Sequence, residues 1–448
     1  MMHESSAFPL PSASRPDMTT YEYYEHSHAP RINTDTVLVE SLKRQYPQLE
    51  LTVVESIPCD LLSYAASTGQ AKVTPIIDAK EPLSEPLSWT TFAPPARRMD
   101  GAQGLVVEKL KFGKFLYAWK EHDFILYVAN GRDGSNYFPA VVNQYLLGPV
   151  DGDSKSLISD CGAWALALHD EIWVFDGGMW QKDSALYKSV QKASWKDVIL
   201  DESMKEALQD DVNRFFDSRE RYSRLRVPWK RGAIYWGPPG NGKTVSIKAT
   251  MKTLYDRKDP IPSLYVRSLS SFAGPEYSIK TIFKQARLEA PCLLIFEDLD
   301  SLIGDDVRSY LYNEMDGLQA NDGVLIVGST NHLDRLDPGM SKRPSRFDRK
   351  FEFPKPNVGE RIKYAEFWQK KLRDNEEIEF PDSLCSAIAG ITDGFSFAYM
   401  QEAFVASLLA IAAQEADDSG HLQADGDLDN LVLWREIKRQ VKILREEL

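Results

Sequence analysis

The run GPPGNGKT, residues 237–244, fits the pattern G-x-x-x-x-G-K-[ST] and limits the possible folds more than any other stretch of the chain. The short apolar segment at residues 233–236 predicts a buried strand, and residues 245–254 predict a helix with one apolar side. Between a strand and a helix the pattern binds phosphate, because glycines let backbone N–H groups approach the anion and the helix N-terminus adds positive potential. We therefore predict a nucleotide phosphate site; a glycine-rich turn without a ligand is the alternative.

Two side chains of this loop have definite expected partners. Lys243 is expected to contact the β- and γ-phosphates of a bound nucleotide, and the Thr244 hydroxyl is expected to ligate Mg²⁺. The other expected nucleotide-binding residues surround the phosphates with their backbone: Gly237, Pro238, Pro239, Gly240, Asn241 and Gly242. The expected ligands of this loop are therefore a nucleotide with β- and γ-phosphates and Mg²⁺; the resemblance described below implies that the nucleotide is ATP.

A pair of acids follows a second apolar strand. In CLLIFEDLD, residues 292–300, the apolar run ends at Glu297 and Asp298, as a buried parallel strand does where it reaches a nucleotide. Nucleotide hydrolysis requires one acid near the metal and another that orients the attacking water. We predict that Glu297 and Asp298 fill these two roles between them. An apolar strand that ends in a solvated acidic turn is the alternative.

Polar and basic groups complete the set of candidate catalytic residues. The apolar strand in VLIVGSTN ends near Asn331, whose amide is expected to hydrogen-bond the attacking water or the γ-phosphate. Arg343 and Arg346 lie three positions apart in KRPSRFDRK, a segment too short for a core element. Exposed arginines usually form only a solvated surface, but here they could stabilise charge on the phosphoryl group in transfer.

Composition and the pattern of expected strands and helices divide the chain into four predicted segments. Residues 1–35 are polar and rich in Pro and Ser and predict a disordered tail, and residues 36–195 predict a β-rich accessory domain that selects the substrate. Strands and helices alternate over residues 196–357, which predicts an α/β doubly wound parallel sheet with a phosphate-binding loop. Residues 358–448 predict only helices and form the expected C-terminal α-helical lid domain.

Composition excludes several classes of protein. The net charge of −13 argues against broad nucleic-acid binding, which needs Lys and Arg to neutralise phosphates. No apolar run approaches the ~18 residues of a membrane span, and the first residues lack a signal peptide. The cysteines are far apart and lack metal-ligand spacing: Cys59, Cys161, Cys292 and Cys385. We therefore expect a soluble intracellular protein, most simply in the cytoplasm, with reduced cysteines.

The order of these motifs resembles that of the AAA-type ATPases over roughly residues 196–448. The segments KDVILDESMKEALQDDVNRFF, VPWKRGAIYWGPPGNGKT and TNHLDRLDP most resemble the AAA proteins that assemble the Rieske subunit at the mitochondrial inner membrane. The N-terminal half does not match the membrane anchor of that group. As a whole, the chain resembles a group of fungal AAA proteins with EIWVFD just before the ATPase core.

The resemblance implies roles at the nucleotide. Residues 237–244 correspond to Walker A, Glu297 and Asp298 to Walker B, and Asn331 to sensor 1. Most AAA proteins carry Asp-Glu at Walker B, whereas this chain carries Glu-Asp. The shorter acid at the water-orienting position is expected to affect the rate of hydrolysis. In the lid motif DGFSFAY, Phe397 replaces a glycine that normally approaches the adenosine.

The resemblance also implies contacts beyond one subunit. Arg343 and Arg346 correspond to arginine fingers that reach the nucleotide of a neighbour, which implies a homo-oligomeric ring, expected to be a hexamer. Residues 316–318, Asp-Gly-Leu, match the loop that signals between subunits. In SSFAG, the residues Phe272, Ala273 and Gly274 resemble the loop that lines the central pore and grips polypeptide. A buried aromatic in a strand–helix turn is the alternative for Phe272.

Taken together, these patterns predict an ATP-hydrolysing AAA protein that remodels or translocates a protein substrate, whose identity the patterns do not indicate. A nucleotide-dependent switch or scaffold with slow hydrolysis and no threading is the alternative. A DNA-handling AAA+ protein is disfavoured by the net charge. Residues 425–436 have an EF-hand-like acidic spacing, but Asn430 occupies the position that requires glycine, so an acidic turn before the last helix is favoured.

Overall fold

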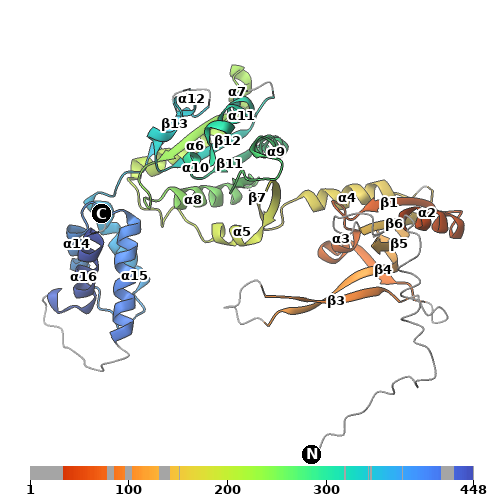
Figure 1. Ribbon diagram of the computed structural model, residues 1–448, viewed down its shortest axis with the longest axis horizontal. Helices are drawn as coiled ribbons and strands as arrows, with labels where there is room; N and C mark the ends of the chain where they lie inside the picture. Colours follow the sequence, from red (N-terminus) through yellow and green to blue (C-terminus); the bar gives the residue numbers. More distant parts are fainter. Residues whose placement is uncertain are drawn as a thin grey trace, which may run out of the picture. The chain divides into compact units, whose positions relative to one another are not determined.

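The computed structural model describes residues 34–77, 85–95, 103–130, 142–150, 152–316, 319–341, 343, 346–375, 377–414 and 428–446. By its internal contacts the chain divides into two compact units, Met1–Ala167 and Leu168–Leu448 (Figure 1). Nearly all of the expected tail, residues 1–35, lies outside the described residues. In the described part, no helix is long and apolar enough to cross a lipid bilayer.

The N-terminal unit is built on an antiparallel sheet of six strands. The strand order is β1-β6-β5-β4-β2, and β3 pairs with the first half of the long strand β4. Tyr117, Trp119 and Leu126 are buried in its core, as expected for aromatic and β-branched strands with one packed face. Its elements are α2 (Thr34–Gln45), β1 (Glu50–Glu55), α3 (Leu61–Thr68), β2 (Ala71–Pro75), β3 (Leu87–Ala93), β4 (Leu105–Trp119), β5 (His122–Asn130), β6 (Val142–Gly148) and α4 (Ser154–Leu166).

The C-terminal unit contains a seven-stranded sheet of order β13-β9-β12-β11-β10-β7-β8. All neighbours are parallel except β7 and β8, so the expected doubly wound parallel sheet is confirmed. Strand β11 is buried along its whole length, which explains why its sequence is continuously apolar. The strands are β7 (Ile172–Asp176), β8 (Met179–Asp183), β9 (Arg231–Trp236), β10 (Ser263–Val266), β11 (Cys292–Phe296), β12 (Val324–Thr330) and β13 (Arg349–Glu352).

Strands β7 and β8 correct the expected domain boundary. Residues 36–195 were expected to form one accessory domain, but β7 pairs in parallel with β10 and therefore extends the sheet of the C-terminal unit. The division falls instead between Ala167 and Leu168. The reason is physical: a short apolar strand has the same composition in an antiparallel sheet as in a parallel one, and only its partner distinguishes the two.

Helices cover both faces of this sheet (Figure 1). Leu208 of α6 and Ile247 of α8 pack into one apolar core, and Ile279 of α9 and Leu311 of α11 pack into the core on the opposite face. The Asp201 side chain accepts hydrogen bonds from the N–H groups of Ser203 and Met204 and so begins α6. The helices are α5 (Ser184–Gln191), α6 (Glu202–Asp217), α7 (Arg219–Leu225), α8 (Lys243–Tyr255), α9 (Pro275–Leu288), α10 (Leu299–Leu302), α11 (Asp305–Asp316) and α12 (Pro338–Ser341).

After β13 the described residues contain helices but no strand, as the sequence predicts for residues 358–448. A capping box between Asn357 and Glu360 begins the first of these helices. Trp368 and Phe404 stack with ring centroids 5.1 Å apart inside a separate apolar core. The helices are α13 (Val358–Lys371), α14 (Asp382–Ile391), α15 (Phe397–Gln414) and α16 (Val432–Glu446).

Candidate functional site

The predicted phosphate-binding loop joins the end of β9 to the start of α8. Gly237, Gly240 and Gly242 all have positive φ, at 142°, 76° and 92°. A Cβ atom on Gly237 would lie 2.3 Å from the Phe353 carbonyl oxygen, and one on Gly240 would lie 2.4 Å from the Ala398 Cβ. The backbone conformation therefore favours glycine at all three positions, and close packing adds to this requirement at Gly237 and Gly240.

Lys243 is buried at the start of α8. Its Nζ donates hydrogen bonds to the Gly237 carbonyl at 2.6 Å and to the Pro238 carbonyl at 3.0 Å. Burial lowers the pKa of the Lys243 ammonium, while nearby Asp298, and to a smaller extent other acids, act to raise it. An anionic phosphate in the loop would compensate this burial better than neutral carbonyls do.

Glu297 connects the loop to the second predicted motif. Its Oε1 accepts a hydrogen bond from the Thr244 hydroxyl at 2.6 Å, and its Oε2 accepts one from the Tyr265 hydroxyl at 2.8 Å. Hydroxyl and carboxylate oxygens are the protein ligands that Mg²⁺ prefers, so Thr244 and Glu297 fit the expected metal. Tyr265, near the end of β10, was not expected here. Burial raises the pKa of its hydroxyl, and the Glu297 charge adds to this effect.

Asp298 occupies an uncommon backbone conformation. Its φ is 52°, in the left-handed region, which costs a non-glycine residue roughly 1–2 kcal/mol. Its N–H donates to the Ser329 hydroxyl at 3.2 Å, and the hydroxyl of Thr330 donates to Asp300 Oδ1 at 2.6 Å. These bonds join the ends of β11 and β12 and hold the turn after Glu297.

A pocket of about 400 Å³ brings Lys243, Thr244, Asp298 and Asn331 together, whereas Glu297 contacts Thr244 without lining the pocket. At one end the lining side chains and backbone are those of the predicted phosphate site, and at the other end the lining is apolar and aromatic. There the rings of Tyr364 and Phe397 lie 5.1 Å apart, centroid to centroid. The lining residues are Asp197, Val198, Ile199, Pro239, Gly240, Gly242, Lys243, Thr244, Val245, Asp298, Ser329, Asn331, Tyr364, Phe397, Ala398 and Gln401.

The helical lid closes the aromatic end of this pocket. Tyr364 belongs to α13, and Phe397 is the first residue of α15. The Ala398 N–H donates to the Gly240 carbonyl at 3.2 Å, so the lid contacts the phosphate-binding loop directly. Among the aromatic residues, Tyr364 was not expected at this site. It lies twelve residues after the last strand, and no motif in the sequence marks it.

The two predicted arginines do not line this pocket. The Arg346 side chain is only 6% exposed: its Nε lies 2.7 Å from Asp316 Oδ2, and it donates to the Gly339 carbonyl at 2.6 Å. Its guanidinium also lies 3.5 Å from the ring centroid of Tyr312. Arg343 is exposed, with NH1 3.7 Å from Asp316 Oδ2. One acid therefore holds both arginines, while residues 317–318 lie outside the described residues.

Phe272 is fully exposed on the loop between β10 and α9. The alternative that Phe272 is a buried aromatic is therefore wrong. Ala273 is also exposed, and Gly274 adopts a φ of 85° immediately before α9. The Ser271 hydroxyl donates to the Gly274 carbonyl at 2.8 Å, which ties the base of the loop while its tip faces solvent.

Residues 233–355 match the family described as "ATPase family associated with various cellular activities (AAA)". Similar curated proteins include the ATP-dependent zinc metalloprotease FtsH of Mycoplasmopsis pulmonis, 27% identical over 397 residues, covering 84% of this chain and 49% of that protein. FtsH of Neorickettsia risticii is 30% identical over 271 residues, covering 57% of this chain and 41% of that protein. This chain thus spans less than half the length of these relatives.

A solved structure described as "Crystal structure of FIGL-1 AAA domain" is 21% identical, with a TM-score of 0.44, and the match covers 56% of this chain and 84% of that one. The matched residues 233–355 include the glycine loop, the acid pair and Asn331. The chain carries an AAA-type P-loop ATPase domain.

Proposed function

We propose that this protein hydrolyses ATP and uses the free energy to remodel or translocate a protein substrate as a homo-oligomeric ring, most simply a hexamer. The observation that carries the ATPase part is the convergence of Lys243, Thr244, Asp298 and Asn331 on one pocket. The exposed ring of Phe272 supports the polypeptide part. Remodelling is also consistent with the family of the domain.

Each residue of the pocket has a chemical task in this proposal. Bound ATP with Mg²⁺ supplies the phosphoryl group for transfer. The loop N–H groups and the Lys243 ammonium hold the phosphates, and Thr244 and Glu297 supply oxygen ligands on the metal side. Asp298 orients the attacking water and accepts its proton, and Asn331 fixes that water in line with the bond that breaks.

The ring accounts for the arginines. Arg343 and Arg346 lie outside the pocket of their own chain, yet phosphoryl transfer gains strongly from an added guanidinium. A neighbouring subunit supplies that group in our proposal. Asp316 contacts both arginines, and it therefore sets where they can point.

Phe272 is the proposed contact with substrate. An exposed aromatic ring can pack against any extended polypeptide, because the contact does not depend on a particular side chain. Its loop begins just after β10, whose Tyr265 donates to Glu297. A displacement of Glu297 would thus reach the loop through this hydrogen bond and the short stretch of chain from Tyr265 to Phe272.

One observation favours the second candidate, a nucleotide switch with slow hydrolysis. Asp298 has a shorter side chain than the glutamate usual at its position, and its backbone is already strained at φ 52°. A badly placed carboxylate would leave ATP bound for long periods, and the protein would then act through its nucleotide state alone.

The test measures ATP hydrolysis with and without a permanently unfolded protein as the probe. We expect the unfolded chain to stimulate the wild-type ATPase by about two- to fivefold, on the scale of allosteric couplings of ~1 kcal/mol. Phe272→Ala should retain basal hydrolysis and lose the stimulation, while Tyr277→Ala, which removes an exposed aromatic from nearby α9, should retain both. Basal hydrolysis without any stimulation of the wild type would support the switch instead.

A further inference from the structure

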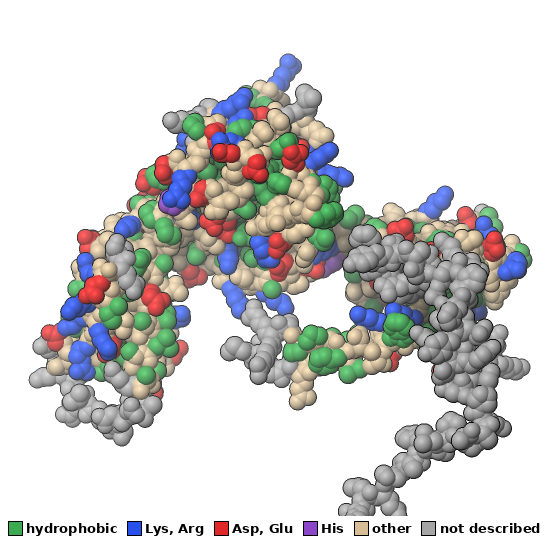
Figure 2. Space-filling view, viewed as in Figure 1, with side chains coloured by type: hydrophobic (Ala, Val, Ile, Leu, Met, Phe, Trp, Pro, Cys, Tyr) green, Lys and Arg blue, Asp and Glu red, His purple; other side chains and the backbone are tan. Residues whose placement is uncertain are grey.

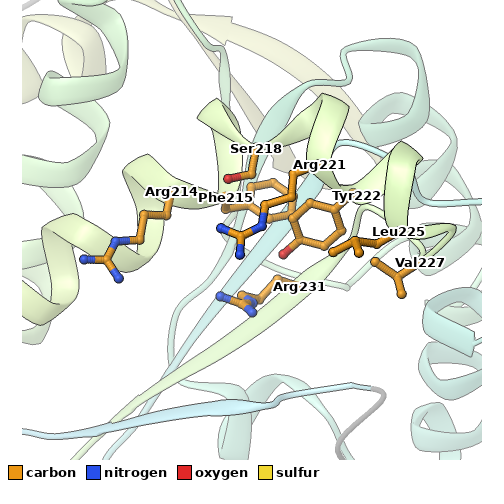
Figure 3. Close-up of a pocket in the computed structure, with 8 residues that line it drawn as sticks. All are labelled: Arg214, Phe215, Ser218, Arg221, Tyr222, Leu225, Val227 and Arg231. Carbon is orange, nitrogen blue, oxygen red and sulfur yellow. The ribbon is translucent and has the colours of Figure 1, made fainter.

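A second pocket lies at the other end of β9 from the nucleotide. It has a volume of about 230 Å³ and combines arginine side chains with an apolar lining. Figure 3 shows the guanidinium groups of Arg221 and Arg231 and the hydroxyl of Tyr222 gathered around one space, with Arg214 to one side. We name it the arginine pocket; its lining residues are Arg214, Phe215, Ser218, Arg221, Tyr222, Leu225, Val227 and Arg231.

The charges of two of these arginines are already compensated. Arg231 lies 2.9 Å from Asp211 and 3.2 Å from Asp348, and Arg214 lies 2.6 Å from Asp210. Arg221 is exposed and makes no ion pair or hydrogen bond within the part of the chain that the structure describes. The pocket therefore has one uncompensated guanidinium beside a tyrosine hydroxyl, which together favour a carboxylate or another anion.

The surroundings of the pocket strengthen its positive potential. Residues 219–231 contain six Lys or Arg side chains and one acid, although the whole chain has a net charge of −13. Figure 2 shows basic side chains at the end of the C-terminal unit where Figure 1 draws α7. A nucleic acid would need a larger basic surface than one short helix provides, so the potential better suits a short acidic polypeptide.

The chain itself contains a segment with the complementary chemistry. Residues 415–427, EADDSGHLQADGD, carry five acids and no Lys or Arg, and we name them the acidic segment. Leu422 lies between the two groups of acids. An apolar side chain flanked by carboxylates suits a pocket with apolar walls, Leu225 and Val227, and an arginine at its edge.

The acidic segment of a chain is too short to reach the arginine pocket of the same chain. It is held at both ends, by Gln414 of α15 and by Leu428. Thirteen residues that leave and return extend at most roughly 23 Å from their anchors. Helix α15 alone is about 27 Å long. It begins beside the phosphate loop, and Figure 1 draws its far end and α7 at opposite ends of the unit.

We propose that the arginine pocket binds the acidic segment of a second copy of this chain. Arg221 pairs with its carboxylates, and Leu422 enters between Leu225 and Val227. The contact would link the helical lid of one subunit to helix α7 of the next. The proposal rests on the proposed ring only for the supply of the second copy, because the binding itself requires neither ATP nor hydrolysis.

The direct test titrates a fluorescent peptide of residues 414–429 into full-length protein in which a Gly/Ser linker of equal length replaces the acidic segment. We expect micromolar affinity that weakens severalfold between about 50 and about 300 mM salt. Arg221→Glu should weaken binding by about tenfold or more. Arg224→Glu is the matched control, because Arg224 is exposed on the same helix but does not line the pocket.

Three results of the titration would overturn the proposal. One is an equal loss of peptide affinity in Arg221→Glu and Arg224→Glu, which would show only a general effect of charge. Another is equal binding of a scrambled peptide of the same composition. The third is no peptide binding while a short RNA or polyphosphate binds in an Arg221-dependent manner. Because nucleotide is absent, these outcomes do not depend on whether the protein hydrolyses ATP or forms a ring.

A disulfide experiment tests whether the bound acidic segment belongs to a second copy of the chain. Two variants with different tags, Val227→Cys and Leu422→Cys, are mixed under mild oxidation. The four native cysteines are buried, so the introduced thiols dominate the reaction. We expect a disulfide that joins the two tags. In the double variant carrying both cysteines, a disulfide formed only within single chains at high dilution would contradict docking between copies.

Discussion

The two ends of the nucleotide pocket are built by different kinds of interaction. At the phosphate end, positive-φ glycines, the buried Lys243 and the bonded Glu297 fix atoms through hydrogen bonds of 2.6–3.0 Å. At the opposite end, Tyr364 and Phe397 form an aromatic contact at 5.1 Å, carried by helices of the lid. Interactions at the phosphate end depend on the direction of hydrogen bonds and on charge. Interactions at the aromatic end depend mainly on the area and the shape of the contact.

This difference implies different tolerance to change. A hydrogen-bonded charge loses most of its interaction when one partner is removed, because the other remains buried and unpaired. An aromatic contact loses only part of its area, because neighbouring side chains can relax into the space. We therefore expect variants at the phosphate end to have large effects and variants at the aromatic end to have modest ones.

The largest effect should come from Lys243→Ala. Loss of the ammonium removes the charge partner of the phosphates, and we expect affinity to fall by about 100-fold or more, equivalent to ~3 kcal/mol. Calorimetric titration with both ATP and inorganic tripolyphosphate measures it. The affinities for both ligands should fall equally, since only the phosphate end of the pocket changes. Retained micromolar affinity for ATP would show that this end does not bind as described.

The next effect separates binding from hydrolysis at the same end. Asp298→Asn keeps the size of the side chain but removes the base, so we expect turnover to fall by about 10²–10⁴-fold while ATP affinity stays within about twofold. Asp298→Glu, the length usual in AAA proteins, should retain activity. A parallel loss of affinity in Asp298→Asn would instead assign the residue to phosphate or metal binding.

The smallest effect should come from Phe397→Ala at the aromatic end. Stacking on the base contributes about 0.5–1.5 kcal/mol, so ATP affinity should fall by about two- to tenfold. Tripolyphosphate affinity should not change, because that ligand has no base. Phe397→Tyr is the control that preserves the ring. If Phe397→Ala weakened both ligands equally, the two ends of the pocket would not be independent.

Much of the phosphate end could be predicted from the sequence because its chemistry depends on residues close together along the chain. Eight consecutive residues make the loop, and the fold brings Glu297 to Thr244 as a parallel strand order requires. The left-handed backbone of Asp298 could not be predicted, since any acid after an apolar strand would look the same in the sequence. Its conformation depends on the Ser329 hydroxyl, a partner from another strand.

The aromatic end was less predictable for the opposite reason. Phe397 stood out only as a departure from a lid motif, and Tyr364 carried no signal, because both act through contacts between separate helices. Tyr265 was missed because a tyrosine near the end of a strand usually packs rather than donates to a carboxylate. The prediction that β7 and β8 belong to the accessory domain was wrong for a similar reason. The sheet to which they belong is decided by the pairing of β7 with β10, which composition does not encode.

The β7–β8 hairpin makes the first residues after the N-terminal unit part of the ATPase sheet. Strand β7 follows Leu168 closely and is hydrogen-bonded along β10, and Arg267, just after β10, lies 3.4 Å from Asp176 and 3.5 Å from Asp183. The hairpin turn is so close to the neighbouring loop that a Cβ on Gly178 would lie 2.5 Å from that of Ser271, the residue before Phe272. A displacement of β7 would therefore pass directly to β10 through strand pairing, and from β10 to the loop that carries Phe272.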